Sequence, residues 1–283
     1  MNAGAKVAGF AAGLAVVLGV AWAAGAAVGP VVDEPEPMGH DMTESAGHQE
    51  AGEHLPGGLA VAQEGYRLAL ADDVLAPGSR RLAFTIVGPD GHPVTAYDVE
   101  HEKRLHLIVV RRDFTGFQHV HPVLDAATGE WSTDVRLTPG PWRVLADFVP
   151  TGGPDLTLGG DLLVPGEVAP PAAQPVQRTD TVAGYTVTVA GDLAAGEHSM
   201  LAMTVTRDGA PVTDLQPYLG ASGHLVALRE GDLAYLHVHP GEDGLDFGAE
   251  VPTPGRYHLY LDFKHAGVVH TARFVLEAAE HGH

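Results

Sequence analysis

The stretch HLIVVRRDFTGFQHVHP, from His106 to Pro122, returns later in the chain as HLVALREGDLAYLHVHP, from His224 to Pro240. The two copies align without a gap. Downstream of each copy, TPGPWRVLADF from Thr138 matches TPGRYHLYLDF from Thr253, again without a gap. Matched blocks in the same order indicate an internal duplication, in which one structural unit occurs twice.

Each copy has the pattern of an antiparallel β-sheet protein. The apolar runs are short and rich in β-branched or aromatic residues, and Asp-Gly, Pro-Gly and Gly-Gly turns separate them. Outside the N-terminal segment, no window has the periodicity of an amphipathic helix. We therefore predict an all-β protein with two tandem, duplicated antiparallel β-sandwich domains, each immunoglobulin- or cupredoxin-like.

The composition narrows the classes of partner and cofactor. The chain of 283 residues carries a formal charge of -20, with 36 acidic against 16 basic residues. Phosphate binding needs clustered lysine and arginine, so we expect no nucleic-acid partner, whereas cations are attracted. The chain has no cysteine. That excludes disulfides, thiolate catalysis, iron–sulfur clusters and a cysteine-ligated blue-copper centre.

The apolar N-terminal segment predicts export. Residues 7–29 carry no charged side chain and are long enough to cross a hydrocarbon core of about 30 Å. Lys6 precedes the segment and acidic residues follow it, which favours an N-terminus in the cytoplasm. We predict a single-pass anchor in the cell membrane with extracytoplasmic C-terminal domains. The alternative is a signal peptide cleaved near Ala21–Ala23, which would give a secreted protein.

Two stretches of biased composition set the predicted domain limits. Residues 30–58 are acidic and poor in aliphatic side chains, which is typical of a disordered tether. Residues 164–180 are proline-rich and have no periodicity, as in a linker. The predicted order is an anchor or signal peptide over 1–29, the tether over 30–58, a first β-sandwich over 59–163, the linker over 164–180, a second β-sandwich over 181–278 and a histidine-containing tail over 279–283.

The histidines of the repeated stretch share one face if that stretch forms a β-hairpin. A hairpin that turns between Asp113 and Phe114 places His106 opposite His121, with His119 as the diagonal neighbour. His119 and His121 share a face because side chains alternate along a strand. A turn of odd length would shift the register and move His106 to the other face.

The second copy predicts the same arrangement. A hairpin that turns between Gly231 and Asp232 places His224 opposite His239, with His237 as the diagonal neighbour. Three imidazoles on one face are a good ligand set for copper or zinc, with a fourth position for water or a carboxylate. The sequence therefore predicts one metal site in each copy, unless the imidazoles are fold features that bond backbone carbonyls.

Further candidate ligands lie outside the hairpins. Asp147 and Asp262 hold matching positions and could bind the metal, orient a histidine or make a structural hydrogen bond. In the tether, MGHDM places Met38 and Met42 around His40. Thioether sulfur with imidazole nitrogen suits Cu(I) or Ag(I), and a polar linker of biased composition is the alternative interpretation. The tail, His281 to His283, could be another exposed binder.

The repeated stretch followed by PGPWRVLADF resembles a group of exported bacterial proteins with an HVHP box that are associated with copper and other heavy-metal resistance. More loosely, the architecture is similar to CopC-type and YtkA-like β-sandwich modules. The resemblance covers both repeats and implies an accessory role in metal handling outside the cytoplasm. Copper carriers that bind metal through an N-terminal histidine of the mature chain differ from this chain, so that ligand is not transferred.

Three functions follow as hypotheses. The first is a membrane-tethered extracytoplasmic protein that binds copper, or alternatively zinc, and buffers, scavenges or delivers it, with a metal transporter or a copper enzyme as partner. The second is a structural or adhesive β-sandwich protein of the cell envelope without a metal role. The third is a metalloenzyme similar to superoxide dismutase. No general base or activated nucleophile is evident, so we expect no enzymatic activity.

Overall fold

The computed structural model describes residues 56–280, apart from 237 and 242–243. These residues form β-strands joined by turns and loops, and among them there is no helix. None of the described segments is therefore a helix able to span a membrane. The predicted anchor, the predicted tether up to residue 55 with Met38, His40 and Met42, and the tail from residue 281 lie outside the described residues.

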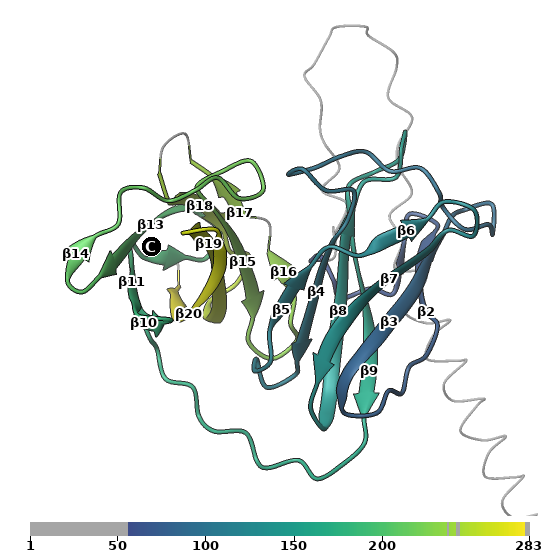
Figure 1. Ribbon diagram of the computed structural model, residues 1–283, viewed down its shortest axis with the longest axis horizontal. Helices are drawn as coiled ribbons and strands as arrows, with labels where there is room; N and C mark the ends of the chain where they lie inside the picture. Colours follow the sequence, from purple (N-terminus) through teal and green to yellow (C-terminus); the bar gives the residue numbers. More distant parts are fainter. Residues whose placement is uncertain (1–55, 237, 242–243, 281–283) are drawn as a thin grey trace, which may run out of the picture. The chain divides into compact units, whose positions relative to one another are not determined.

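The first repeat consists of two antiparallel sheets (Figure 1). One contains, in spatial order, β1 (Ala62–Gln63), β2 (Tyr66–Leu70), β3 (Gly78–Val87), β7 (Glu130–Leu137) and β6 (Val123–Asp125). The other contains β5 (Gln118–Val120), β4 (His106–Arg111), β8 (Gly140–Phe148) and β9 (Leu156–Val164).

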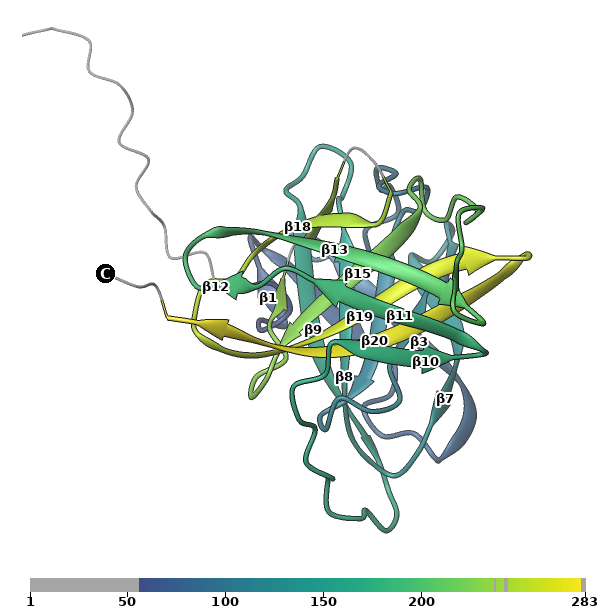
Figure 2. The same ribbon diagram turned by 90° about the vertical axis from the view of Figure 1, so that its left-hand side faces the viewer.

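The second repeat also has two sheets, and Figure 2 shows their longest strands, β13, β19 and β20. One contains β10 (Thr179–Val182), β11 (Tyr185–Ala190), β13 (His198–Arg207), β18 (Asp246–Glu250) and β17 (Val238–Pro240), and β14 (Ala210–Pro211) pairs with β13. The other contains β12 (Leu193–Ala194), β20 (Val268–Ala279), β19 (Gly255–His265), β15 (Gly223–Arg229) and β16 (Tyr235–Leu236).

The two repeats have the same strand order, which confirms the predicted duplicated β-sandwich. The order β2-β3-β7-β6 in the first repeat corresponds to β11-β13-β18-β17 in the second. The order β5-β4-β8-β9 corresponds in the same way to β16-β15-β19-β20. The matched positions also agree in detail, because His106 pairs with Asp147 and His224 pairs with Asp262.

Each sandwich encloses its own apolar core. In β4, Leu107 and Val109 belong to the core of the first repeat, and in β15, Leu225 and Ala227 belong to that of the second. The alternation of inward and outward side chains along a strand produces this pattern. The strands β4 and β15 differ from most others in one respect, because their outward-facing apolar residues are buried as well.

A third apolar cluster joins the two repeats. It contains the outward-facing residues of β4 and β15 and aromatic residues from neighbouring strands and turns. Equivalent positions from both repeats take part: Ile108 and Val226, Val110 and Leu228, Leu145 and Tyr260, Phe117 and Tyr235. The two repeats therefore pack through the same face of their sheets, as two identical subunits do in a two-fold dimer. In this layer the Phe117 ring stacks on Tyr260 at a centroid distance of 3.8 Å.

Candidate metal centre

The β4–β5 hairpin has the register that the sequence predicts. Ile108 pairs with His119, and continuation of the same register places His106 opposite His121. Because side chains alternate along a strand, all three histidines project from the same face as Ile108. Ile108 belongs to the inter-repeat cluster. The histidines of the first repeat therefore face the second repeat.

The three imidazoles of this hairpin converge. His106 Nδ1 lies 3.0 Å from His119 Nε2 and 3.3 Å from His121 Nε2. One ring nitrogen of each histidine lies within 4.8 Å of the other two. Two nitrogens that bind one ion at 2.0–2.1 Å with a tetrahedral angle are roughly 3.3 Å apart. The two short separations are therefore close to those of a metal-binding set.

Acceptor groups determine which nitrogen carries the hydrogen in two of these rings. His106 Nε2 lies 3.1 Å from the carbonyl oxygen of Glu100, and His119 Nδ1 lies 2.8 Å from Asp262 Oδ2. Carbonyl and carboxylate oxygens accept hydrogen bonds, so these two nitrogens donate. In the neutral rings, His106 Nδ1 and His119 Nε2 then present lone pairs to each other. A cation held between them removes that repulsion.

Asp262 reaches the cluster from β19 of the second repeat. The side chains of Asp262 and His119 are only 4% and 1% exposed. The second carboxylate oxygen, Oδ1, accepts a hydrogen bond from Thr271 Oγ1. A carboxylate that binds the outer nitrogen of a histidine fixes the ring and makes the inner nitrogen a better metal ligand. Asp262 is placed for that role.

His224 of the second repeat lies against the same cluster. Its ring stacks on His106 at a centroid distance of 5.3 Å and on His119 at 4.9 Å. His224 Nε2 is buried and has no hydrogen-bond partner within the described part of the chain. His101, which is exposed, lies 5.6 Å from His224 and 6.0 Å from His106, centroid to centroid. Unsatisfied buried nitrogens are rare, so this position favours a bound ligand.

Burial keeps the rings neutral. Desolvation, reinforced by the charge that His119 would carry, lowers the pKa of His106 to about 4 and that of His121 to about 3. Desolvation and the neighbouring imidazoles lower the pKa of His224 to about 2. Metal binding requires the neutral imidazole, because only that form has a free lone pair. At neutral pH these three rings are in that form.

The histidines of the second repeat are placed differently from the predicted triplet. His239 is exposed and lies in β17, which pairs with β18, whereas His224 lies in β15 of the other sheet. His237 lies outside the described residues. The physical reason is that the chain passes from one sheet to the other earlier in the second repeat than in the first. In the first repeat β5 includes His119, whereas in the second repeat β16 ends at Leu236, before the equivalent position.

The two matched aspartates share one interaction. Asp147 Oδ1 accepts a hydrogen bond of 2.8 Å from Thr157, and Asp262 accepts one from Thr271, the equivalent residue. Asp147 Oδ2 also accepts a longer bond of 3.4 Å from the Tyr235 hydroxyl. The threonine bond is thus the structural feature that both copies retain. In addition to this shared bond, Asp262 accepts a hydrogen bond from His119 of the other repeat.

The profile of one protein family matches both repeats, over residues 60–157 and 180–280. The chain belongs to this family, described as "Domain of unknown function (DUF8832)". No curated protein matches this DUF8832 chain. The duplicated match agrees with the two sandwiches that the structure shows.

Several solved structures are similar to this DUF8832 chain over part of their length. InvD of Yersinia pseudotuberculosis is 13% identical with a TM-score of 0.25, and the alignment covers 77% of this chain and 58% of that one. The Yersinia pseudotuberculosis adhesin InvE is 9% identical with a TM-score of 0.22, over 75% and 58% of the two chains. A putative membrane anchored protein from Corynebacterium diphtheriae is 10% identical with a TM-score of 0.22, over 77% and 59%. The chain thus spans less than two thirds of each of these structures, and scores this low support no argument about function.

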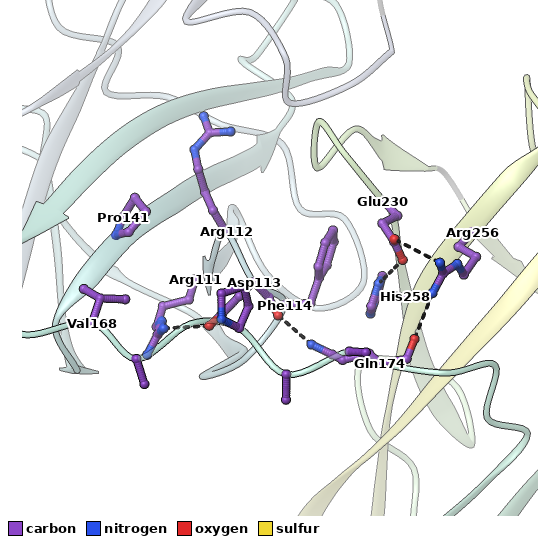
Figure 3. A pocket seen from close by; sticks show the side chains of 14 residues that line it. Arg111, Arg112, Asp113, Phe114, Pro141, Val168, Gln174, Glu230, Arg256 and His258 are labelled. Carbon is purple, nitrogen blue, oxygen red and sulfur yellow. Dashed lines mark hydrogen bonds and ion pairs between the residues drawn. The ribbon is translucent and has the colours of Figure 1, made fainter.

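A separate cavity of about 550 Å³ lies between the β4–β5 turn and the linker (Figure 3). Three arginines line it, and each has an acidic partner within 4 Å, the closest being Arg111 with Asp113 at 2.6 Å. His258 stacks on Phe114 and also contacts Glu230. With its positive charges already neutralised, this cavity lacks the free cationic groups that would select an anionic ligand.

The sequence pattern predicts two separate histidine sites, and it predicts neither the position of His101 nor the contact of Asp262 with the first repeat. One signal for the contact between repeats was available. The runs LHLIVV and HLVAL are apolar at every position after the histidine, and a strand with that pattern is buried on both faces. The outer face of each of these sheets therefore had to be covered, and the other repeat covers it.

Proposed function

We propose that this protein binds a transition-metal ion, copper or alternatively zinc, at the cluster formed where the two repeats meet. His106, His119 and His121 supply the ligand nitrogens, and Asp262 orients His119. His224 lies against the cluster and is the first candidate for a fourth ligand. In this proposal the metal is cargo that the protein buffers, scavenges or delivers, and no catalysis is involved.

One observation carries the proposal. Two buried rings are tied at their outer nitrogens to groups that only accept hydrogen bonds, and their inner nitrogens lie 3.0 Å apart. A cation held between these two nitrogens would remove the repulsion of their lone pairs. The third inner nitrogen lies 3.3 Å from the first, so two of the three separations are close to that of nitrogens that share one tetrahedral ion.

The cellular role rests on the sequence. The apolar segment over residues 7–29 supports a membrane anchor with extracytoplasmic repeats, and the formal charge of -20 favours cations near the molecule. Met38, His40 and Met42 in the tether are proposed as auxiliary ligands for Cu(I). A metal transporter or a copper enzyme at the membrane would be the recipient or donor.

A metal titration tests the proposal. We expect the full-length protein to bind one Cu²⁺ or Zn²⁺ at the cluster more tightly than micromolar, as measured by calorimetry in competition with a chelator. The variant His121→Ala should weaken that binding at least ten-fold, or about 1.4 kcal/mol. The control His92→Ala removes an exposed histidine of the same repeat and should leave the affinity unchanged. Equal affinities in all three proteins would refute the metal site.

The second candidate is a structural or adhesive envelope protein, in which the histidines join the repeats and a shared proton takes the place of the metal. A specific observation favours it. The repeats are already held together by an apolar cluster and by a buried hydrogen bond of 2.7 Å from the Tyr260 hydroxyl to the Phe114 carbonyl oxygen.

The stability of the metal-free protein separates the two candidates. If the histidines serve only to join the repeats, Zn²⁺ at ten times the protein concentration should leave the unfolding midpoint unchanged. If the histidines form a metal site, Zn²⁺ binds only the folded state and must raise the unfolding midpoint. At a free Zn²⁺ concentration of one hundred times Kd, the free energy of unfolding should rise by about 2.7 kcal/mol.

A further inference from the structure

The outer face of the sheet β11-β13-β18-β17 carries a row of three paired residues that the proposed function does not use. Met200 of β13 pairs with Gly248 of β18, and His239 of β17 pairs with the same glycine from the other side. Residues paired directly across strands project from the same face. Gly248 has no side chain of its own and is buried, so the side chains around it cover its backbone.

The His198 side chain also lies next to Gly248. It precedes Met200 by two positions in β13 and lies on the same exposed face. A Cβ built on Gly248 would lie 2.7 Å from His198 Nε2 and 3.8 Å from Met200 Sδ. The nitrogen and the sulfur thus both lie over the glycine, in the space that a side chain would fill. They cannot be farther apart than the sum of those two distances.

The residue types on this face are unusual for exposed positions. The Met200 side chain is 52% exposed, whereas Met203 in the same strand is 7% exposed and packs in the core. Within the described part of the chain, no hydrogen bond or ion pair occupies the His198 ring. The neighbouring outward residues of β18, Asp246 and Glu250, are acidic and exposed. Acidic neighbours favour a cation over an anion at this face.

We propose that His198, Met200 and His239 form a second metal site, exposed on the sheet surface over Gly248, for a soft monovalent cation of the Cu(I) or Ag(I) class. Soft thioether sulfur selects such ions over Zn²⁺, and imidazole nitrogen completes the ligand set. The absence of a side chain at position 248 lets the His198 ring lie over the strand, toward Met200. This site is separate from the inter-repeat cluster, and the proposal does not depend on metal binding at that cluster.

The experiment uses Ag(I) as the probe and the full-length protein with ¹³C-labelled methionine methyl groups. Met38→Leu, His40→Ala and Met42→Leu are introduced together, so that the tether does not compete. One equivalent of Ag(I) should shift the Met200 methyl signal. The Met203 methyl signal should stay in place, which serves as an internal control for the fold. A Met200 signal that does not move through four equivalents would overturn the proposal.

Variants in the same background identify the other ligands. His198→Asn and Met200→Leu should each weaken Ag(I) binding at least ten-fold, and Gly248→Ala should do so as well because its methyl group would displace the His198 ring. The matched controls are Met203→Leu, in the core, and His92→Asn, exposed in the first repeat. Unchanged affinity in either His198→Asn or Met200→Leu would show that no such site exists.

A cross-test separates this site from the inter-repeat cluster. The variant Met200→Leu should keep full Zn²⁺ affinity at the cluster, and His121→Ala should keep the Ag(I)-induced shift of the Met200 methyl signal. Loss of the Met200 shift in His121→Ala would overturn the claim that the two sites are separate. Retention of the shift supports the surface site even if no Zn²⁺ binds at the cluster.

Discussion

His119 Nδ1 lies 2.8 Å from Asp262 Oδ2, although the two residues are 143 positions apart and belong to different repeats. Both side chains are almost completely buried. The two repeats therefore form one histidine cluster together, because each repeat provides part of it. The bond also fixes the His119 ring so that its other nitrogen faces His106.

The first prediction concerns the orienting carboxylate. Asp262→Asn should weaken Zn²⁺ or Cu²⁺ binding ten- to a hundred-fold, because loss of a carboxylate behind a ligand histidine typically has that effect. Asp214→Asn is the matched control, since Asp214 also contacts a histidine, His265, at 3.1 Å but away from the cluster. Calorimetric titration of both variants measures the difference. Equal affinities in the two variants would contradict an orienting role for Asp262.

The second prediction concerns the folded state without metal. His119→Ala should destabilise the protein by about 1–3 kcal/mol, because it removes the imidazole donor from the buried Asp262 carboxylate and leaves that carboxylate only its bond from Thr271. His121→Ala removes a half-buried ring with no such partner and should cost far less. Urea unfolding of the metal-free variants gives both values. Similar losses in the two variants would show that the pair of His119 and Asp262 is not a buried ion pair or charge-assisted bond.

The third prediction concerns pH. The pKa values of His106, His121 and His224 in the folded protein, about 4, 3 and 2, lie below the ordinary value of about 6.5 for an unfolded chain. Above pH 6.5 the rings are neutral in both states and have no effect. As the pH falls below 6.5, only the unfolded chain takes up these protons, so the metal-free protein loses stability.

Urea unfolding between pH 7 and pH 4 measures this loss. The variant His121→Asn removes one of the titrating rings and should show a shallower fall in stability over that range. A variant with the same slope as the unsubstituted protein would mean that His121 is not held neutral by burial. Carboxylates also titrate toward the lower end of the range, but they are common to both proteins and cancel in the comparison.

The hairpin register could be derived from the two-residue periodicity of the sequence, although the turn is not the simple even one that the derivation used, because the Arg111 N–H donates to the Thr115 carbonyl oxygen. Ile108 and His119 pair as the pattern requires. The sharing of a site between repeats could not be derived in the same way, since it depends on which sheet faces pack together. The place where the second repeat changes sheets, after Leu236, is also a property of tertiary packing. As a result, His239 lies away from His224 in a different sheet.

The fourth prediction tests how the repeats are held together without metal. Tyr260→Phe removes the hydroxyl that donates to the Phe114 carbonyl oxygen at 2.7 Å. The loss of one buried hydrogen bond should cost about 1 kcal/mol of unfolding free energy. Metal affinity should not change, because Tyr260 contacts the apolar layer and not the histidines. A large loss of metal affinity would mean that packing of the repeats, and not the ring geometry, controls the site.

Nitrogen-15 NMR of the imidazole rings during titration of the full-length protein with Zn²⁺ shows whether the three inner nitrogens bind the metal. At one equivalent, we expect the signals of His106 Nδ1, His119 Nε2 and His121 Nε2 to move to the range of metal-bound nitrogen. The protonated nitrogens that donate to Glu100 and Asp262 should keep their N–H signals, and exposed His92 should not respond. If Zn²⁺ leaves those three inner nitrogens unchanged, the histidines join the repeats without binding metal.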